Sequence, residues 1–375
     1  MRPTWRLLGA LVLGAVIYLY GATSEVAWLF LFGLLLWAAA LAMLGYTRWN
    51  SRGVAASIRL LAVESSPHSP SPDLPESAFR DAPLPAPVFE GDTVELELAL
   101  TVTGGSARGP ARLATDIGGR QLAAGSGLVP AAGWRRVERL EPVRRGSLAA
   151  SGVTLDTGDP LGFFRHRRRS ADQRLAVVLP LFSSLATSVQ VRELESAFTA
   201  VRPGHGNDLY GVREYRAGDP LRRIHWRTSA RRGELVVREF EPPGLRIVGL
   251  LLDPTPATPE AADQVARLAA SEAWDCLRSG GRVVAWCPGR EATRLDESRS
   301  LWSILEWLAL YPDLPVDPSG PPRVMDAIAF LTRPGGPALD ALQDMQSRGA
   351  GARAWLVGEG ELEVPYQAVG TEWPL

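Results

Sequence analysis

Two long apolar runs separated by a short polar turn open the chain, and they constrain its fold more than any other feature. Residues 7–22 are apolar and uncharged, and residues 26–46 are apolar again. The second run can cross a hydrocarbon core of roughly 30 Å as a helix, and the first is near the lower limit. A second run so soon after the first, with no convincing A-x-A site between them, argues against a cleaved signal peptide. We expect residues 1–52 to form a two-helix membrane anchor, with a pair of buried core helices as the alternative.

The charges that flank the two runs predict their orientation. Arg2 and Arg6 precede the first run, Arg48 and Arg52 follow the second, and the turn carries Glu25. Since basic flanking residues stay on the cytoplasmic side of a membrane, both ends of the hairpin are predicted to lie in the cytoplasm. The same argument places everything that follows the anchor in the cytoplasm.

Composition limits the class of the remaining chain. Lys and Arg number 40 and Asp and Glu 41 among 375 residues, so the net charge is −1. This length accommodates two or three domains, and the balanced charge creates no overall field that would favour nucleic acid. Cys276 and Cys287 fall in apolar helix and strand patterns. We expect both to be buried thiols, and a disulfide framework is excluded.

Residues 53–190 have the pattern of a small all-β, sandwich-like domain, with a barrel as the alternative. Residues 94–102 alternate strictly, with apolar side chains at every second position, which is typical of a half-buried antiparallel strand. Further strands are expected, separated by Gly and Pro, at residues 111–117, 134–140, 147–155 and 174–179. The segment 67–87 holds seven prolines and is expected to be an irregular insertion or linker.

Residues 244–375 change to an alternation of strands and helices. Buried apolar strands are expected at residues 245–252, 282–287, 327–331 and 352–357. Amphipathic helices separate them, among them a helix at residues 337–347. Apolar strands that alternate with amphipathic helices predict a doubly wound α/β domain, in which both faces of a parallel sheet are covered.

Between these two domains, residues 191–243 combine Arg, acidic and aromatic side chains in an unusual density. Nine Arg and six Asp or Glu lie between residues 202 and 241. The favoured interpretation is an internal polar network, because Arg forms bidentate pairs with carboxylates and stacks on aromatic rings. The candidate network consists of Arg213, Glu214, Tyr215, Asp219, Arg223, Trp226, Arg231, Arg238 and Glu239. An exposed patch for a partner's carboxylates or phosphates is the second interpretation, and a weak nucleic-acid-binding module is the third.

Catalytic motifs are absent from the sequence. It contains no H-x-x-x-H or C-x-x-C pair for zinc, no G-x-x-x-x-G-K-[ST] loop and no G-x-S-x-G element. Asp219, His225 and Ser229 could be written as an orienting group, a base and a nucleophile, but closeness in sequence is not catalytic geometry. We therefore expect a protein that is not an enzyme, and a hydrolase of unknown substrate is the alternative.

The run from residue 211 to residue 241 resembles the signature of a bacterial family called domain of unknown function 58. The matching residues are Arg213-Glu214-Tyr215, Gly218-Asp219, Arg223-Ile224, Trp226, Ala230-Arg231, Leu235 and Val237-Arg238-Glu239. Upstream, Arg145-Gly146 and the run 159–164 resemble further family elements, with Leu161 in place of an aromatic residue. An anchor, a β region and an α/β domain follow one another in the same order in that family.

The resemblance implies a role without implying a reaction. The activity of that family is not established, and its members are typically encoded beside MoxR-type AAA ATPases. The resemblance therefore implies a multi-pass protein of the bacterial inner membrane that acts as an adaptor or scaffold for such an ATPase in assembly or envelope-related processes. Protein partners are expected, and nucleic acid is not.

The α/β domain of that family resembles a von Willebrand factor A domain, which implies a metal site that this sequence retains in part. Such a site begins with D-x-S-x-S and suits Mg²⁺, an ion that prefers oxygen ligands. Asp253 and Thr255 fit this pattern, whereas Ala257 lacks the second hydroxyl, and Arg333 stands near the position of a later Asp. A guanidinium there opposes cation binding. We expect no cofactor, and we expect Asp253 to bond backbone groups of its Pro-rich turn.

Overall fold

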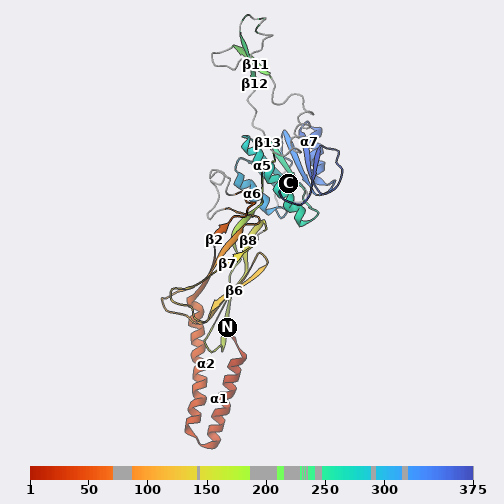
Figure 1. Ribbon diagram of the computed structural model, residues 1–375. Coiled ribbons are helices and arrows are strands. Elements are labelled where there is room, and N and C mark those ends of the chain that lie inside the picture. The colour runs from red at the N-terminus through yellow and green to blue at the C-terminus, as the bar shows by residue number, and fades with distance from the viewer. Residues whose placement is uncertain are drawn as a thin grey trace. The chain divides into compact units, whose positions relative to one another are not determined.

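The computed structural model describes most of the chain, which folds into two compact units (Figure 1). Met1–Pro72 and Ala82–Val178 form the first unit, and Leu179–Leu375 with Asp73–Asp81 form the second. The described residues are 1–70, 87–141, 144–185, 209–214, 229, 231, 233, 235–240, 247–288, 293–314 and 320–374.

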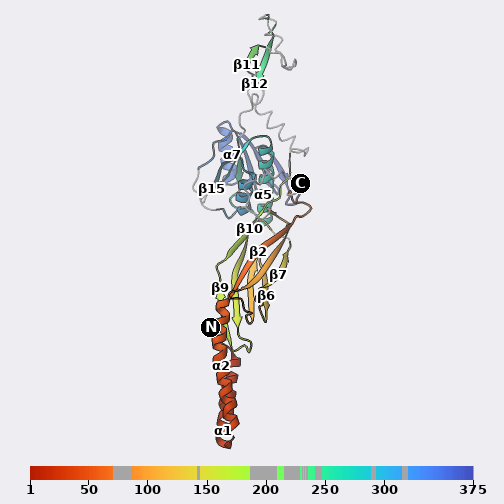
Figure 2. The same ribbon diagram turned by 90° about the vertical axis from the view of Figure 1, so that its left-hand side faces the viewer.

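Two long helices, α1 (Trp5–Ser24) and α2 (Ala27–Gly53), begin the first unit and pack side by side (Figures 1 and 2). Both are long and apolar enough to cross a membrane. In each helix, 11% of the 18-residue apolar stretch is buried. Glycines form their contact, since a Cβ on Gly14 would lie 2.7 Å from Nε1 of Trp37, and one on Gly33 would lie 2.9 Å from the Gly14 carbonyl oxygen. Small residues that permit such close approach are typical of helix pairs in membranes.

The β domain of the first unit consists of two sheets. In one, β4 (Thr93–Val102) lies between β2 (Val54–Glu64) and β7 (Trp134–Leu140), and all pairings are antiparallel. The other has the order β1-β9-β8-β10-β3, and β5 and β6 extend it from β8. Its strands are β1 (Arg2–Pro3), β3 (Val88–Phe89), β5 (Ala111–Ile117), β6 (Arg120–Ser126), β8 (Gly146–Gly158), β9 (Phe164–Arg169) and β10 (Gln173–Leu179).

The two sheets enclose one apolar core. The alternating residues of β4 face it, and Val94, Leu96, Leu98 and Leu100 are fully buried there against residues of β5 and β8 such as Leu113. Burying such a side chain stabilises a fold by about 1.5–3 kcal/mol relative to leaving it exposed. The predicted strands at 111–117 and 134–140 are confirmed at their bounds. Burial alternates along the strand at 111–117, whereas the strand at 134–140 is mostly exposed and shows no such alternation.

The second unit contains a sheet of six strands in the order β15-β14-β13-β16-β17-β18. The four central strands, β13 (Ile247–Leu252), β14 (Arg282–Cys287), β16 (Asp326–Leu331) and β17 (Gly351–Val357), are parallel, as predicted. β18 (Tyr366–Val369) continues the parallel pairing at one edge. β15 (Thr293–Ser298) runs antiparallel to β14, so the expectation of a wholly parallel sheet is wrong at the other edge. The short connection between β14 and β15 has no room for a crossover helix, and a parallel pair needs one.

Helices cover both faces of this sheet. On one face, α7 (Pro337–Ser347) packs Leu339 and Leu342 against alternate residues of β16 and β17. On the other, α5 (Pro259–Arg278) hydrogen-bonds to β17 through Glu272, and α6 (Leu301–Leu310) contacts α5. The first turn of α5 is fixed by Thr258, whose hydroxyl accepts from the backbone N–H of Ala261 at 3.1 Å. The strand order reverses between β13 and β16, which makes their carboxyl ends the place where such folds hold ligands.

Candidate functional site

Four of the nine predicted network residues lie in one two-stranded hairpin. It consists of β11 (Leu209–Glu214) and β12 (Val236–Phe240), which pair antiparallel. Arg213 stands opposite Val237, and Glu214 stands opposite Val236. Because alternate positions of a strand share a face, Arg213 and Glu239 lie on one face of the hairpin and Glu214 and Arg238 on the other.

The rest of the predicted network falls in the connection between β11 and β12. Tyr215, Asp219, Arg223 and Trp226 lie outside the described residues, so their part in a network stays a prediction. Arg231 is exposed.

The proposed hydrolytic group of Asp219, His225 and Ser229 is described at one position. Asp219 and His225 lie outside the described residues. Ser229 is buried, and its carbonyl oxygen accepts from the backbone N–H of Gly233 at 2.9 Å. Nothing in the described geometry tests the hydrolase alternative.

Asp253 stands at the switch point of the sheet, directly after β13, and it is buried there. Its Oδ2 accepts from the hydroxyl of Thr332 at 2.6 Å and from the backbone N–H of Thr332 at 3.2 Å. Its Oδ1 accepts from the backbone N–H of Thr255 at 3.0 Å. Thr332 comes directly after β16, so this carboxylate holds together the two strands between which the order reverses. Its bond to the turn matches the expected backbone role.

The surroundings of this carboxylate do not fit a divalent cation. The Thr332 hydroxyl donates to Asp253 and accepts from the backbone N–H of Ala257 at 3.0 Å, so it is engaged on both sides. Arg333 donates to the carbonyl oxygen of Thr255 at 2.6 Å. Mg²⁺ requires several oxygen ligands in octahedral geometry, and a neighbouring guanidinium opposes it. Within the described residues, no group of three or more His, Cys, Asp or Glu side chains could hold a metal ion. At the switch point, the hydrogen bonds between Asp253 and Thr332 therefore join the ends of β13 and β16.

Cys287 ends β14 and is buried beside the same carboxylate. Burial raises the pKa of the Cys287 thiol to about 12, and the negative charge of Asp253 adds to the effect. A thiol that stays protonated is a poor nucleophile and a poor metal ligand. Cys276 is also buried, and its thiol donates to the carbonyl oxygen of Arg282 at 3.5 Å, so the prediction of two buried thiols is confirmed.

A buried ion pair that the sequence analysis missed joins α5 to the sheet. Arg353 on β17 donates to Oε2 of Glu272 at 2.7 Å, and Nε1 of Trp355 donates to Oε1 of the same carboxylate at 2.8 Å. The Arg and Glu side chains are 4% and 7% exposed, so the pair is shielded from water. The signal was a single Arg inside an apolar strand, and its partner is too distant in sequence to be recognised by periodicity.

A second missed cluster joins the helical hairpin to the β domain. Asn50, which is fully buried in the last turns of α2, donates from Nδ2 to the carbonyl oxygens of Gly158 at 2.8 Å and Pro110 at 3.3 Å. Its Oδ1 accepts from the backbone N–H of Gly109 at 3.1 Å. The Arg108 guanidinium stacks on the ring of Trp49, with Cζ 3.5 Å from the ring centroid. α2 continues to Gly53, beyond its apolar run, because these turns find partners in the β domain.

The amino end of α1 is attached to the β domain as well. Arg2 and Pro3 pair as β1 with β9, at Arg165 and Phe164. The Thr4 hydroxyl donates to the carbonyl oxygen of Gly162 at 2.6 Å. Both ends of the helical pair are therefore attached to the same domain.

In comparisons with known proteins, a family model matches the hairpin of β11 and β12, here called the signature hairpin, and the start of the α/β domain. A family model described as "Protein of unknown function DUF58" matches residues 211–295. An "Uncharacterized protein YeaD" of Bacillus subtilis (strain 168) is 29% identical over 155 residues, which is 40% of this chain. The match spans 38% of the length of that relative. The resemblance in the signature segment is thus supported, for a family whose function is not established.

Proposed function

We propose that this protein is a membrane-anchored scaffold that presents its signature hairpin and α/β domain to a protein partner in the cytoplasm. The helices α1 and α2 would hold it in a bacterial inner membrane as a multi-pass anchor. The partner that we propose, from the family resemblance, is a MoxR-type AAA ATPase.

The attachment of both ends of the helical pair, α1 and α2, to the β domain is the observation that carries this proposal. Asn50 and Thr4 bond the carboxyl end of α2 and the amino end of α1 to neighbouring backbone of that domain. Helices that expose an apolar surface need lipid around them, and helices that return to one domain leave both ends on the same side of a bilayer. The basic residues at those ends support the cytoplasmic side.

An interaction role is favoured over catalysis by the chemistry of the switch point. In an α/β domain of this order, a ligand or metal would bind at the carboxyl ends of β13 and β16. There, Asp253 is engaged by Thr332 and Thr255, and Cys287 is held as a protonated thiol. We infer that the domain keeps the framework of a von Willebrand factor A-like fold and uses it for protein contact without a metal.

Affinity purification from detergent-solubilised membranes tests this function. The tagged full chain is expected to recover a MoxR-type AAA ATPase, identified by mass spectrometry. Arg213→Glu reverses one charge of the signature segment on β11, and it is expected to reduce recovery. Arg135→Glu on the exposed face of β7 is the matched charge reversal, and recovery should be unchanged. Absence of any ATPase, together with a hydrolytic activity that Asp219→Ala abolishes, would establish the alternative.

A further inference from the structure

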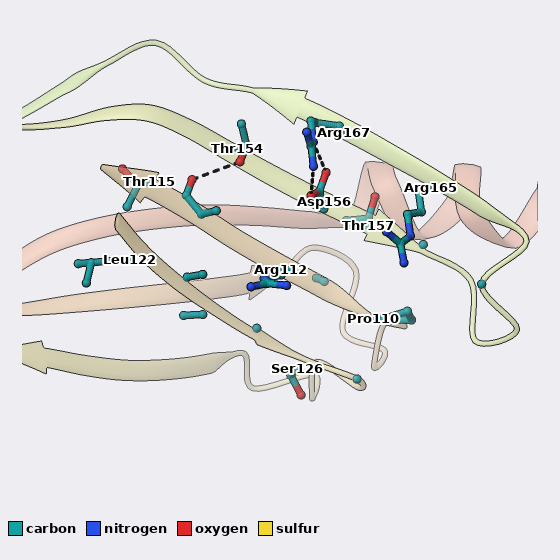
Figure 3. A pocket seen from close by; sticks show the side chains of 18 of the residues that line it. Pro110, Arg112, Thr115, Leu122, Ser126, Thr154, Asp156, Thr157, Arg165 and Arg167 are labelled. Carbon is teal, nitrogen blue, oxygen red and sulfur yellow. Dashed lines mark hydrogen bonds and ion pairs between the residues drawn. The ribbon is translucent and has the colours of Figure 1, made fainter. Parts of the chain in front are cut away.

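A broad groove lies on the outer face of the larger sheet of the β domain, at the end next to the helical hairpin (Figure 3). It has a volume of about 1160 Å³, and residues of β5, β6, β8 and β9 line it together with Arg6 of α1. Drug-sized ligands occupy pockets of about 300–1,000 Å³, so a phospholipid headgroup with its glycerol fits within this space.

The strand register creates the groove by alternating small and charged residues. Across the sheet, Gly125 of β6 stands opposite Arg112 of β5, which stands opposite Asp156 of β8. A Cβ on Gly125 would lie 2.6 Å from the carbonyl oxygen of Ala111, so the floor has no room for a side chain there. Ala114 and Ala123 form the next row of the floor. The arginine side chains therefore project beside a surface of small residues, and a ligand can bind on that surface.

The charge of the groove is positive, and its acidic groups are already engaged. Five Arg and three Asp line it. Asp156 receives two hydrogen bonds from Arg167, at 2.7 Å and 2.8 Å, which lower the pKa of that carboxyl. Asp159 accepts from the backbone N–H groups of Phe163 and Phe164 at 3.1 Å and 2.6 Å. Asp116 accepts from the backbone N–H of Gly119 at 3.0 Å.

Three of the arginines have guanidinium groups available for an anion. Arg6, Arg112 and Arg165 form no ion pair or side-chain hydrogen bond with any residue that the structure describes, and all three are exposed. Figure 3 shows Arg112 on β5 and Arg165 on β9, the two strands that flank β8 and its Asp156, which is bound to Arg167. Guanidinium groups bind phosphate oxygens in a bidentate manner, so this set suits a phosphate ligand.

The position of the groove identifies the source of that phosphate. Arg6 lies in the first turn of α1, one residue before the apolar run, and Gly162 beside it also lines the groove. The groove thus opens where the hairpin meets the headgroup layer of the proposed bilayer. Anionic lipids concentrate at the cytoplasmic surface, and basic pockets at that level bind their headgroups.

We propose that the groove formed by Arg6, Arg112 and Arg165 binds the headgroup of an anionic phospholipid from the membrane that holds the hairpin. This inference rests on the proposed membrane anchorage. Bound lipid would add electrostatic attachment to the apolar anchor and fix the β domain against the membrane surface.

Native mass spectrometry of the detergent-purified full chain, titrated with phosphatidylglycerol or phosphatidylcholine of the same acyl chains, tests the proposal. The intact chain should bind phosphatidylglycerol more tightly. Arg112→Gln with Arg165→Gln should weaken that binding about 30-fold, which corresponds to about 2 kcal/mol at about 1 kcal/mol for each arginine. The control pair, Arg135→Gln with Arg169→Gln, removes the same charge outside the groove and should retain the preference.

Several outcomes would overturn the proposal. These are equal affinity for the two lipids, an equal loss in both double variants, or binding of glycerol phosphate alone as tight as that of phosphatidylglycerol. Capture of a soluble acidic protein by the groove in place of lipid would do the same. Alkaline carbonate extraction separates this from anchorage, because all variants should stay in the membrane. Release of the intact chain by carbonate would refute the anchor itself, whatever the lipid titration gives.

Discussion

Replacing Asn50 with Ala should weaken the attachment of the helical hairpin to the β domain. The amide is fully buried and exchanges three hydrogen bonds with the backbone of Gly109, Pro110 and Gly158. Alanine is compatible with the helix, but it lacks the amide that forms these three hydrogen bonds. The carbonyl oxygen of Pro110 also accepts from the backbone N–H of Gly158 at 3.2 Å, and it keeps this bond in the variant. Two groups then lose the partner that Asn50 provides, the N–H of Gly109 and the carbonyl of Gly158.

The size of the effect follows from those two groups. A buried polar group left without a partner costs about 1–3 kcal/mol, so with two such groups the free energy of unfolding of the first unit should fall by about 2–6 kcal/mol. With a urea dependence of about 2 kcal/mol per molar, the unfolding midpoint should shift by about 1–3 M. Pulse proteolysis of the detergent-solubilised full chain in urea measures this, with the surviving fragment that contains residues 87–178 as the readout.

A neighbouring substitution provides the control. The Ser51 hydroxyl bonds to the carbonyl oxygen of Arg48 within its own helix and makes no bond to the described residues of the β domain. Ser51→Ala should therefore change the stability by less than about 0.5 kcal/mol. A loss below that value for Asn50→Ala, or equal losses for the two variants, would refute the idea that this amide fastens the hairpin to the β domain.

Three further predictions concern the α/β domain. Thr332→Val removes the hydroxyl bonded to Asp253 and should cost about 1–3 kcal/mol in urea unfolding of the domain, whereas Thr332→Ser should be nearly neutral. Arg353→Met leaves the buried Glu272 carboxylate without its cation and should lower the free energy of unfolding by about 3–5 kcal/mol. Adding Glu272→Gln to this variant should recover part of the loss, and strictly additive losses would contradict the pairing. The Cys287 thiol should react with iodoacetamide at pH 8.5 at least about a thousand-fold more slowly than a free thiol. Because its folded pKa of about 12 exceeds the ordinary 9.0, its contribution to stability is complete below pH 9.0 and should decline as the pH rises toward 12; rapid native labelling would contradict this.

Local patterns predicted the elements whose burial alternates regularly. The strand within 94–102 and the helix at 337–347 were predictable because each buries one face of a regular element, so neighbours in sequence carry the signal. The strand β9 was missed, because its sequence Phe-Arg-His-Arg-Arg-Arg has no apolar alternation. Its place in the sheet depends on pairing with β8, where Arg167 meets Asp156.

The polar clusters were missed for a different reason. Asn50 finds its partners about sixty and more than a hundred residues away, and Arg353 finds Glu272 across 81 residues. Periodicity contains no information on such pairs, and a single polar residue in an apolar pattern is the local trace that they leave. Thr332 shows the same limit, because its hydroxyl bonds both the Asp253 carboxylate and the backbone N–H of Ala257, and each lies more than seventy residues away in sequence.

Protease protection tests the central claim, a two-helix anchor that leaves the remainder of the chain in the cytoplasm. The full chain with a C-terminal epitope is expressed in a Gram-negative host, and protease is added to intact spheroplasts and to inside-out membrane vesicles. We predict that the epitope is protected in spheroplasts and lost in inside-out vesicles, and that the chain resists carbonate extraction. An epitope digested in spheroplasts, or a chain that carbonate releases, would contradict the account.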